Sequence, residues 1–454
     1  MASTSITRAI SSTSTINKFT LSMWVKRGSL GSYQRMFCSD GGTGDTYFRF
    51  QNNDAIEWSG HASDATAAGL LTTSRVFRDI SAWYHFVIKF DSTQVTSSDR
   101  LKFWVNGVLE TAFSAETMPN QDVTDNIVST SKTHRISGTS SAQYFDGSIA
   151  HCHFTQGYAY DASEFGEFDS TSGIWKPKAS PSVTYGTNGF FLKFEDSSNL
   201  DLDSSGNSLT FTTSGTLTQN VDTPNNNFPT FNSLVPSGAA LSFGNGNLYN
   251  GDQSPNNWQS VPATIGLQNG KWYWELKDEE DWGSTSDSTR RYGIASLDSI
   301  SVGRGDAEDV RYSDNTYAYA YMNASGVRYN GGTISGTTST HPTFQKDDFI
   351  MVAMDLDNNK LYFGKNGTWN DSGDPTSGST GTGSVADISS TATYAPYVET
   401  KYGSDNVSIN FGQGYFRTTS AGTNTDGNGY GKFKYTVPTG YYSICTKNIK
   451  LYGG

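Results

Sequence analysis

One pattern, a strand followed by an aspartate-containing turn, a second strand and Asn-Gly, occurs twice in the chain. Residues 349–356 (FIMVAMDL) form an almost unbroken apolar run, which predicts a strand buried on both faces because the run is too short for most helices. A polar turn and a second short apolar run follow, and Asn366-Gly367 then gives a strong signal for a β-hairpin. Residues 84–107 repeat this order, Asn-Gly included. Two copies of one β-meander predict two β-sandwiches in one protein.

The composition favours the same fold class. The 454 residues are enough for two or three domains with substantial cores. Only 17% of the residues are charged while glycine occurs 47 times, a mixture typical of short strands joined by many turns. The 13% of aromatic residues need a buried core, which excludes a disordered chain. We therefore expect an all-β protein with two antiparallel β-sandwiches of the jelly-roll type in tandem and a short C-terminal tail.

The charge balance limits the partners. A net charge of −12 argues against binding to nucleic acid, because phosphate would be repelled. No apolar stretch approaches the length of a membrane-spanning helix, so membrane insertion is not expected, and the N-terminus shows no secretory signal. The three cysteines are widely separated and odd in number, which predicts buried or incidental thiols in a protein made in a reducing cell.

Alternation of apolar residues and the placement of prolines give the expected domain bounds. Residues 19–25 alternate clearly, with Phe19, Leu21, Met23 and Val25 on one face. The segment 229–240 has two prolines and no periodicity, which indicates a linker. The expected parts are an N-terminal arm (1–18), a first sandwich (19–228), the linker (229–240), a second sandwich (241–416) and a tail (417–454) that docks on a domain or on a neighbouring subunit.

Several segments of the first sandwich resemble the laminin-G-like jelly roll of the concanavalin type. They occur in the family's order and read FTLSMWVKR, WYHFVIKFD, LKFWVNG and DGSIAHCHF. Two further segments, DASEFG and IWKPK, are similar to the version found in structural proteins of marine bacteriophages. This resemblance covers about half of the chain.

The second sandwich resembles a SPRY domain. The matching segments, again in the family's order, are GKWYWEL, RYGIAS, DLDNNKLYFGKNG, YAPYV and VSINFG. The C-terminal tail is similar to the endings of the same phage proteins. It predicts a short strand, a turn and an apolar end.

Together these resemblances imply a non-catalytic protein on the surface of a phage particle, assembled in the host cytoplasm. Its expected role is that of an adhesin on a tail fibre, spike or capsid appendage, which binds a glycan or a protein of the host cell surface. The alternative is a capsid decoration or tail-assembly protein without a host ligand, and a more distant one is a glycan hydrolase. Contacts with other virion subunits and a homo-oligomer are also implied.

The sequence offers no assembled reactive centre. Hydrolases related to laminarinases place three acids at E-x-D-x-x-E on one strand, but Glu167 and Asp169 are followed by Ser172 at the third position. No nucleophile elbow, P-loop or complete G-x-G-x-x-G occurs. We therefore predict that the protein is not an enzyme.

No cofactor is expected, with calcium as the one candidate. Asp40 and Asp45 flank a glycine-rich loop and, by the resemblance, are candidate ligands for the ion that some laminin-G-like domains bind. The run from Asp201 to Gly206 starts like a calcium loop, but Thr212 replaces the acid at its twelfth position, so a hairpin turn is preferred. His151 and His153 have a spacing that can bind a metal, but a polar outer face is preferred there.

Aromatic and arginine residues in loops are the candidate binding groups. Protein-binding SPRY domains use loops at one end of the sandwich, and aromatic and arginine side chains are typical interface anchors. Trp24 and Trp104 lie opposite the apolar faces of their strands, so they are expected to meet either a second layer or a partner. The candidate anchors of the second sandwich are Tyr249, Trp258, Trp282, Arg290 and Arg291.

Overall fold

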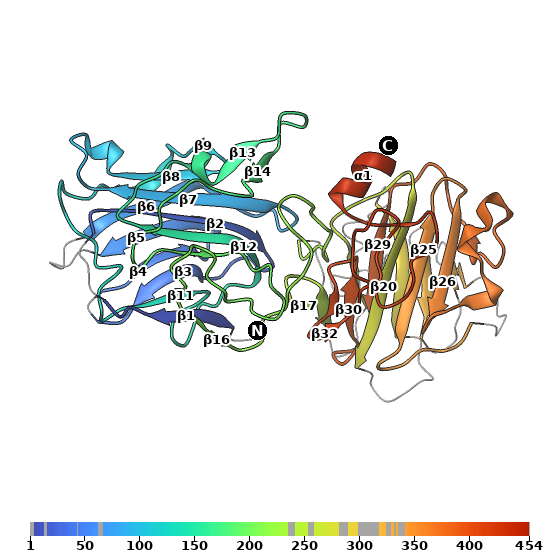
Figure 1. Ribbon diagram of the computed structural model, residues 1–454. Coiled ribbons are helices and arrows are strands. Elements are labelled where there is room, and N and C mark those ends of the chain that lie inside the picture. The colour runs from blue at the N-terminus through green and yellow to red at the C-terminus, as the bar shows by residue number, and fades with distance from the viewer. Residues whose placement is uncertain are drawn as a thin grey trace. The chain divides into compact units, whose positions relative to one another are not determined.

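The computed structural model divides the chain into two compact units, Met1–Gln219 and Asn220–Gly454, called unit 1 and unit 2 below. It describes residues 4–12, 16–42, 44–61, 67–234, 241–252, 258–280, 289–297, 317–323, 328–330, 333–334 and 341–453. Most of the regular structure in these ranges is strand, and almost all strand pairs are antiparallel (Figure 1). The predicted all-β class with two sandwiches is confirmed.

Unit 1 is built from two facing sheets. An eight-stranded sheet has the order β10-β6-β5-β4-β3-β11-β1-β16, and a six-stranded sheet has the order β15-β12-β2-β7-β8-β9. β13 and β14 form a separate hairpin. The strands are β1 (Ser5–Ala9), β2 (Lys18–Arg27), β3 (Gln34–Asp40), β4 (Thr46–Phe50), β5 (Ala55–His61), β6 (Ala67–Val76), β7 (Trp83–Asp91), β8 (Leu101–Val105), β9 (Val108–Leu109), β10 (Phe113–Thr117), β11 (Thr133–Ile136), β12 (Gly147–Gln156), β13 (Gly166–Phe168), β14 (Trp175–Pro177), β15 (Phe190–Leu192) and β16 (Thr212–Ser214).

The core of unit 1 lies between these sheets and is rich in phenylalanine. The alternation predicted for residues 19–25 is confirmed, because Phe19, Leu21, Met23 and Val25 all point into this core. The ring of Phe19 stacks on that of Phe90 from the neighbouring strand β7, with 4.8 Å between the centroids. The β-hairpin predicted at the Asn-Gly pair of residues 106–107 joins β8 to β9.

A further layer covers the outer face of the six-stranded sheet. Trp104 and Val87 on that face pack against Phe165, from the segment that leads into the β13–β14 hairpin. Trp24 stacks on His85 at 4.6 Å. Of the two expectations for Trp24 and Trp104, the second layer is therefore correct, and both residues are buried by unit 1 itself.

Unit 2 also contains two large sheets. One has the order β17-β18-β30-β20-β25-β26-β27, with β28 paired to β26 and β33 paired to β20, and the other has the order β19-β29-β21-β22-β23-β24. The elements are β17 (Leu241–Gly244), β18 (Tyr249–Asp252), β19 (Gln259–Pro262), β20 (Lys271–Glu280), β21 (Arg290–Ser296), β22 (Ala318–Met322), β23 (Arg328–Asn330), β24 (Thr333–Ile334), β25 (Phe349–Asp355), β26 (Lys360–Lys365), β27 (Thr368–Trp369), β28 (Ala386–Asp387), β29 (Tyr394–Thr400), β30 (Asn406–Asn410), β31 (Tyr415–Phe416), β32 (Thr419–Ser420), β33 (Tyr442–Ser443) and the helix α1 (Thr446–Tyr452).

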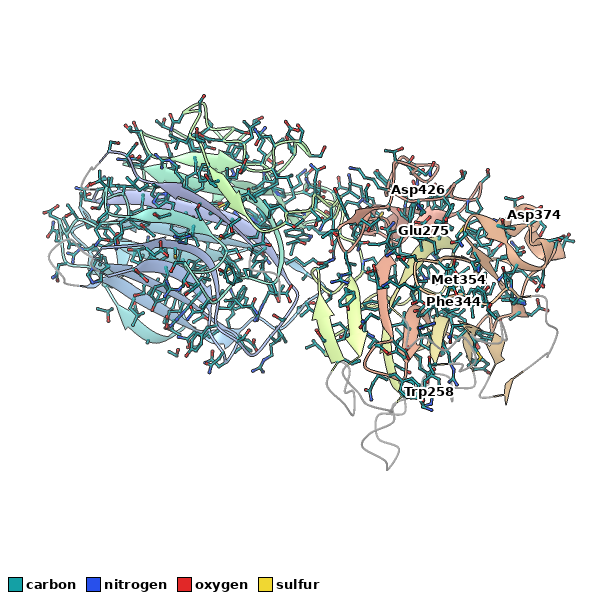
Figure 2. All side chains as sticks on the ribbon, turned by 90° about the horizontal axis from the view of Figure 1, so that it is seen from below. Trp258, Glu275, Phe344, Met354, Asp374 and Asp426 are labelled. Carbon is teal, nitrogen blue, oxygen red and sulfur yellow. The ribbon has the colours of Figure 1, made fainter. Side chains whose placement is uncertain are left out.

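Strand β25 is buried on both faces, as its apolar run predicted. Val352 and Met354 point into the main core of unit 2, where Figure 2 labels Met354. Met351 and Ala353 point the other way, into a smaller cluster that the C-terminal tail covers. The predicted turn at residues 366–367 joins β26 to β27.

The C-terminal tail packs on unit 2. Phe433, Val437 and Tyr441 lie against the outer face of the large sheet, where they contact Tyr273 and Tyr362. Strand β33 then pairs in parallel with β20. After it the chain forms α1, where the sequence predicted only a turn and an apolar end. This helix has no side-chain N-cap, so tertiary contacts hold it, among them a 3.9 Å stack of Tyr452 on Tyr442.

The boundary between the units, at Gln219 and Asn220, precedes the expected linker 229–240. The reason is that Phe228 and Phe231 are fully buried in the core of unit 2, although they were assigned to the first sandwich and to the linker. The expected arm 1–18 likewise contributes β1, which pairs with β11 and β16 of the eight-stranded sheet. Prolines and missing periodicity suggested a linker at residues 229–240 but could not show that Phe231 belongs to the core of unit 2.

Cys38, Cys152 and Cys445 are all buried free thiols. In the ranges described above, no helix combines the length and apolarity needed to cross a membrane.

One buried carboxylate holds the tail on the large sheet. Glu275 of β20 is completely buried and accepts hydrogen bonds from the backbone N–H groups of Lys434 (2.9 Å) and Tyr435 (2.8 Å) and from the hydroxyl of Tyr273 (2.9 Å). Figure 2 shows it inside the unit. Burial raises the pKa of Glu275 to about 7 in spite of these donors.

We predict that Glu275 makes the stability of unit 2 depend on pH. The ordinary pKa is 4.5 and the folded one about 7, so between these values the folded state binds more protons than the unfolded state. The contribution of Glu275 to the free energy of unfolding is therefore complete below pH 4.5 and is lost, by up to about 3 kcal/mol, as the pH rises through 7. In Glu275→Gln, which cannot titrate, this component is absent.

Urea unfolding of wild type and variant from pH 4.5 to 7.5, followed by tryptophan fluorescence, measures the effect. In the difference between the two free energies of unfolding, the contributions of all titratable groups that both proteins share cancel. The exposed Glu116 provides the control, because Glu116→Gln should leave the difference flat. A flat difference for Glu275→Gln as well would contradict the prediction.

Candidate functional site

The outer face of the eight-stranded sheet in unit 1 carries a connected group of arginine and tyrosine side chains. In β4, Phe48 and Phe50 point into the core, so the alternate residues Tyr47 and Arg49 point outward. The strand pairing places Arg49 beside Glu57 of β5. We call Tyr33, Arg35, Tyr47, Arg49 and Glu57 the arginine–tyrosine surface.

Cation–π contacts and an ion pair hold this surface together. The guanidinium carbon of Arg49 lies 4.5 Å from the ring centroid of Tyr33 and 4.6 Å from that of Tyr47. Arg35 lies 4.4 Å from the Tyr47 ring. Arg49 Nη2 is 2.7 Å from Glu57 Oε1. The side chains are therefore ordered before any ligand arrives, which lowers the entropic cost of binding.

The surface offers hydrogen-bond groups next to an accessible ring. Tyr33 is 40% exposed, and the side chain of Arg49 is 16% exposed. Burial, and then the negative charge of Glu57, raises the pKa of Tyr47 above its usual value of 10.0, so this hydroxyl keeps its proton. The guanidinium group of Arg49 and the tyrosine hydroxyls can together match donors and acceptors of sugar hydroxyls, while Glu57 is buried and holds Arg49 in place.

The two candidate calcium ligands lie beside this surface and are engaged by arginine. Both oxygens of Asp40 accept hydrogen bonds from Arg135 Nε, at 2.9 and 2.7 Å, and Asp45 Oδ2 is 3.1 Å from Arg35 Nη1. Among the described residues, no three or more histidine, cysteine, aspartate or glutamate side chains form a group that could hold a metal ion. A calcium ion at Asp40 and Asp45 would have to displace both guanidinium groups.

The other candidate metal motifs have structural roles. Asp203 accepts hydrogen bonds from the backbone of Phe191 and Ser205, at 3.0 and 2.9 Å, which is the behaviour expected of a turn. His153 is buried, bonds Tyr185 Oη through Nδ1 at 2.9 Å and stacks on an aromatic ring. A bulge in β12 separates it from His151, and the expected polar outer face is wrong for His153 because the second layer of unit 1 covers it.

The acids of the incomplete hydrolase motif sit at the β13–β14 hairpin. Lys176 Nζ lies 3.5 Å from Glu167 and 3.0 Å from Asp169. Hydrogen bonds from the backbone of Ser172 and from Lys176 hold the pKa of Asp169 well below its usual range. A carboxylate that stays ionised in this way is unsuited to act as a general acid.

In unit 2 the structure brings together two of the predicted anchors, Trp258 and Arg291. The Arg291 guanidinium lies 3.7 Å from the Trp258 ring centroid and pairs with Glu399 at 3.4 Å. Both residues are largely buried. Figure 2 shows Trp258 at the end of the unit away from Glu275.

The other anchors are placed differently. Tyr249 is half-buried, with the exposed Arg417 4.6 Å from its ring centroid, and Trp282 lies outside the described residues. Arg290 is only 1% exposed, and its guanidinium lies 2.9 Å from Asp278 and 3.4 Å from Asp405. Arg290 is therefore not an exposed anchor in this structure but the counter-charge of two buried carboxylates.

The arginine–tyrosine surface was missed in the sequence, although a signal for it exists. In the segment TYFRF, phenylalanines alternate with Tyr47 and Arg49, which predicts that Tyr47 and Arg49 point outward. A tyrosine and an arginine on one outer strand face are a candidate signal of a binding surface. The partners Tyr33, Arg35 and Glu57 come from other strands and turns. Only the register of the sheet shows that they meet.

We predict that Arg290→Met lowers the free energy of unfolding of unit 2 by about 3–5 kcal/mol, because it removes the guanidinium group that pairs with the buried carboxylates of Asp278 and Asp405. Arg417→Met, which removes an exposed arginine of the same unit, serves as the control and should change it by less than about 0.5 kcal/mol. Urea unfolding measures both. Equal, small effects of the two substitutions would show that Arg290 contributes no more to stability than an exposed arginine.

Comparison with known proteins finds a similarity to one family within unit 1. Residues 3–159 match the family described as the concanavalin A-like lectin/glucanases superfamily. No curated protein matches the chain.

Three solved structures are similar to parts of the chain. The SPRY domain of human HERC1 has 21% identity and a TM-score of 0.29, covering 39% of this chain and 96% of its own. A second human SPRY domain has 14% identity and a TM-score of 0.26, covering 37% and 93%. A protein of Bacteroides ovatus, named as a candidate carbohydrate-binding protein, has 13% identity and a TM-score of 0.30, covering 47% and 56%. The fold of each unit therefore rests on the sheet topology given above, and for unit 1 also on the family match.

Proposed function

We propose that the protein is a non-catalytic, saccharide-binding protein and that the arginine–tyrosine surface of unit 1 is its binding face. The observation that carries this proposal is the ring of Tyr33, 40% exposed and braced by Arg49 at 4.5 Å. An accessible aromatic ring beside ordered donors and acceptors is suited to a sugar, whose C–H face can lie on the ring while its hydroxyls reach the charged groups. The family match of residues 3–159 to lectins and glucanases supports the same class of ligand.

The biological setting that we propose is the surface of a bacteriophage particle, after assembly in the host cytoplasm. It rests on the sequence segments DASEFG and IWKPK and on the C-terminal tail, which resemble phage structural proteins. In that setting the ligand is a glycan of the host cell surface and the protein is an adhesin. Neighbouring virion subunits and further copies of this chain are its proposed structural partners.

The absence of catalysis is part of the proposal. The described carboxylates of the arginine–tyrosine surface and its edge, Glu57, Asp40 and Asp45, are each paired with an arginine, so the surface holds no pair of carboxylates placed to act on a glycosidic bond as a glycosidase requires. Incubation with host polysaccharide should therefore release no reducing sugar.

The binding face is tested by a glycan array probed with the full chain, followed by titration of the best ligand. We expect Tyr33→Ala to weaken binding about tenfold, since it removes the exposed ring from the site. Tyr158, 42% exposed elsewhere on unit 1, provides the matched control, and Tyr158→Ala should leave the affinity unchanged. An array without a retained glycan, or equal losses for both variants, would contradict the proposal.

A second function, as a structural subunit without a host ligand, is favoured by an apolar patch on unit 1. Phe168 (57% exposed) and Ile174 (63%) lie on the β13–β14 hairpin, and Val108 (61%) and Leu109 (42%) lie on β9. Figure 1 shows β9 beside this hairpin. Exposed apolar side chains gathered in this way are typical of contacts between proteins.

For the structural alternative we predict that Phe168→Ser with Ile174→Ser lowers the mass of the assembly measured by light scattering, because the patch then joins copies of the chain. The control is Val95→Ser. Val95 is 82% exposed, but it lies in the connection between β7 and β8, at the end of β8 opposite to β9. An unchanged mass would exclude this patch as a contact between copies.

A further inference from the structure

A groove in unit 2 opens between three segments that are distant in sequence. Residues 221–228 form one wall, residues 423–432 form another, and Lys447 of α1 lies at the rim. The groove has a volume of about 310 Å³, at the lower end of the range of about 300–1,000 Å³ that is typical of small-molecule sites.

Hydrogen bonds join these segments, so the groove is formed before a ligand binds. Asn226 Oδ1 accepts the backbone N–H of Lys447 at 3.1 Å. The backbone N–H of Thr446 donates to the carbonyl of Asn227 at 2.9 Å, and the N–H of Asn227 donates to Thr446 Oγ1 at 3.0 Å. These bonds fix α1 against the first wall.

The second wall is anchored by Asp426, whose charge is used within the protein. Its Oδ1 accepts the backbone N–H groups of Asn428 and Tyr430, both at 2.9 Å. Its Oδ2 accepts Ser443 Oγ and Asn448 Nδ2, both at 2.7 Å. Asp426 is buried, as its place inside the unit in Figure 2 indicates, and it is not among the residues that line the groove.

The lining combines three kinds of chemistry. Lys432 and Lys447 supply two ammonium groups, and neither makes an ion pair with a described carboxylate. Tyr430 supplies a ring, 5.2 Å from Lys447 Nζ. Thr423 and Thr425 supply exposed hydroxyls. None of the described lining residues is an aspartate or glutamate, in a chain with a net charge of −12.

We propose that this groove binds a saccharide unit that carries a negative charge, such as a hexuronate. The ammonium groups pair with its acidic group, the Tyr430 ring lies against its C–H face, and the threonine hydroxyls bond its hydroxyls. A simple inorganic anion would use the lysines and leave the ring and the hydroxyls without a role. The site is on unit 2 and is independent of the saccharide surface proposed for unit 1.

Calorimetric titration of the full chain tests the proposal with digalacturonate, N-acetylneuraminic acid and 6-sulfogalactose, each beside its neutral counterpart, and with inorganic phosphate. We expect at least one acidic saccharide to bind about tenfold or more tightly than its neutral counterpart and than phosphate. Lys447→Met combined with Lys432→Met should weaken that binding about tenfold or more, and 500 mM salt should weaken it as well.

Lys450→Met provides the matched control, since Lys450 is exposed on the same helix but does not line the groove. It should leave the affinity unchanged, as should Tyr33→Ala in unit 1, which separates this site from the proposed lectin function. The proposal is overturned if no acidic saccharide binds, if phosphate or the neutral sugar binds equally well, or if Lys450→Met weakens binding as much as the double variant.

Discussion

Burial of aromatic rings on both faces of the same sheets is the constraint on which both units depend. In unit 1, Phe19 stacks on Phe90 between the sheets, while Trp104 needs a further layer on the opposite face. In unit 2, β20 directs Trp274 inward and Tyr273 outward, and the outward ring is covered by the tail. A sheet with aromatic residues on both faces is stable only with a third layer, because an exposed row of such rings would lose the free energy of burial.

This constraint decides where binding chemistry can lie. The β13–β14 hairpin segment occupies the outer face of one sheet in unit 1, and the tail does so in unit 2. In unit 1 the outer face of the eight-stranded sheet instead carries the partly exposed Arg49 and the exposed Tyr33. In unit 2 the tail that closes the core also helps to build the groove, because residues 423–432 form one of its walls and Lys447 of α1 lies at its rim.

Local sequence patterns predicted the strands well. They could not predict features that depend on contacts between residues distant in the sequence. The alternation from Phe19 to Val25 and the apolar run of β25 depend only on neighbouring residues, so both were readable in the sequence. Arg290 looked like an interface anchor because its two carboxylate partners, Asp278 and Asp405, come from other parts of the chain. The same limit applies to Phe231, whose proline-containing surroundings suggested a linker although the residue is fully buried.

Whether a charged group is used within the fold or is available to a ligand depends on partners that are distant in the sequence. The net charge of −12 indicates an acidic chain, but several acids are enclosed: Glu275 and Asp426 accept hydrogen bonds from backbone N–H groups, and Asp278 pairs with Arg290. Each of these acids interacts with groups of the protein itself. The charge that a ligand meets is therefore set by the remaining groups, so that an acidic chain can present a groove lined by two ammonium groups and no described carboxylate.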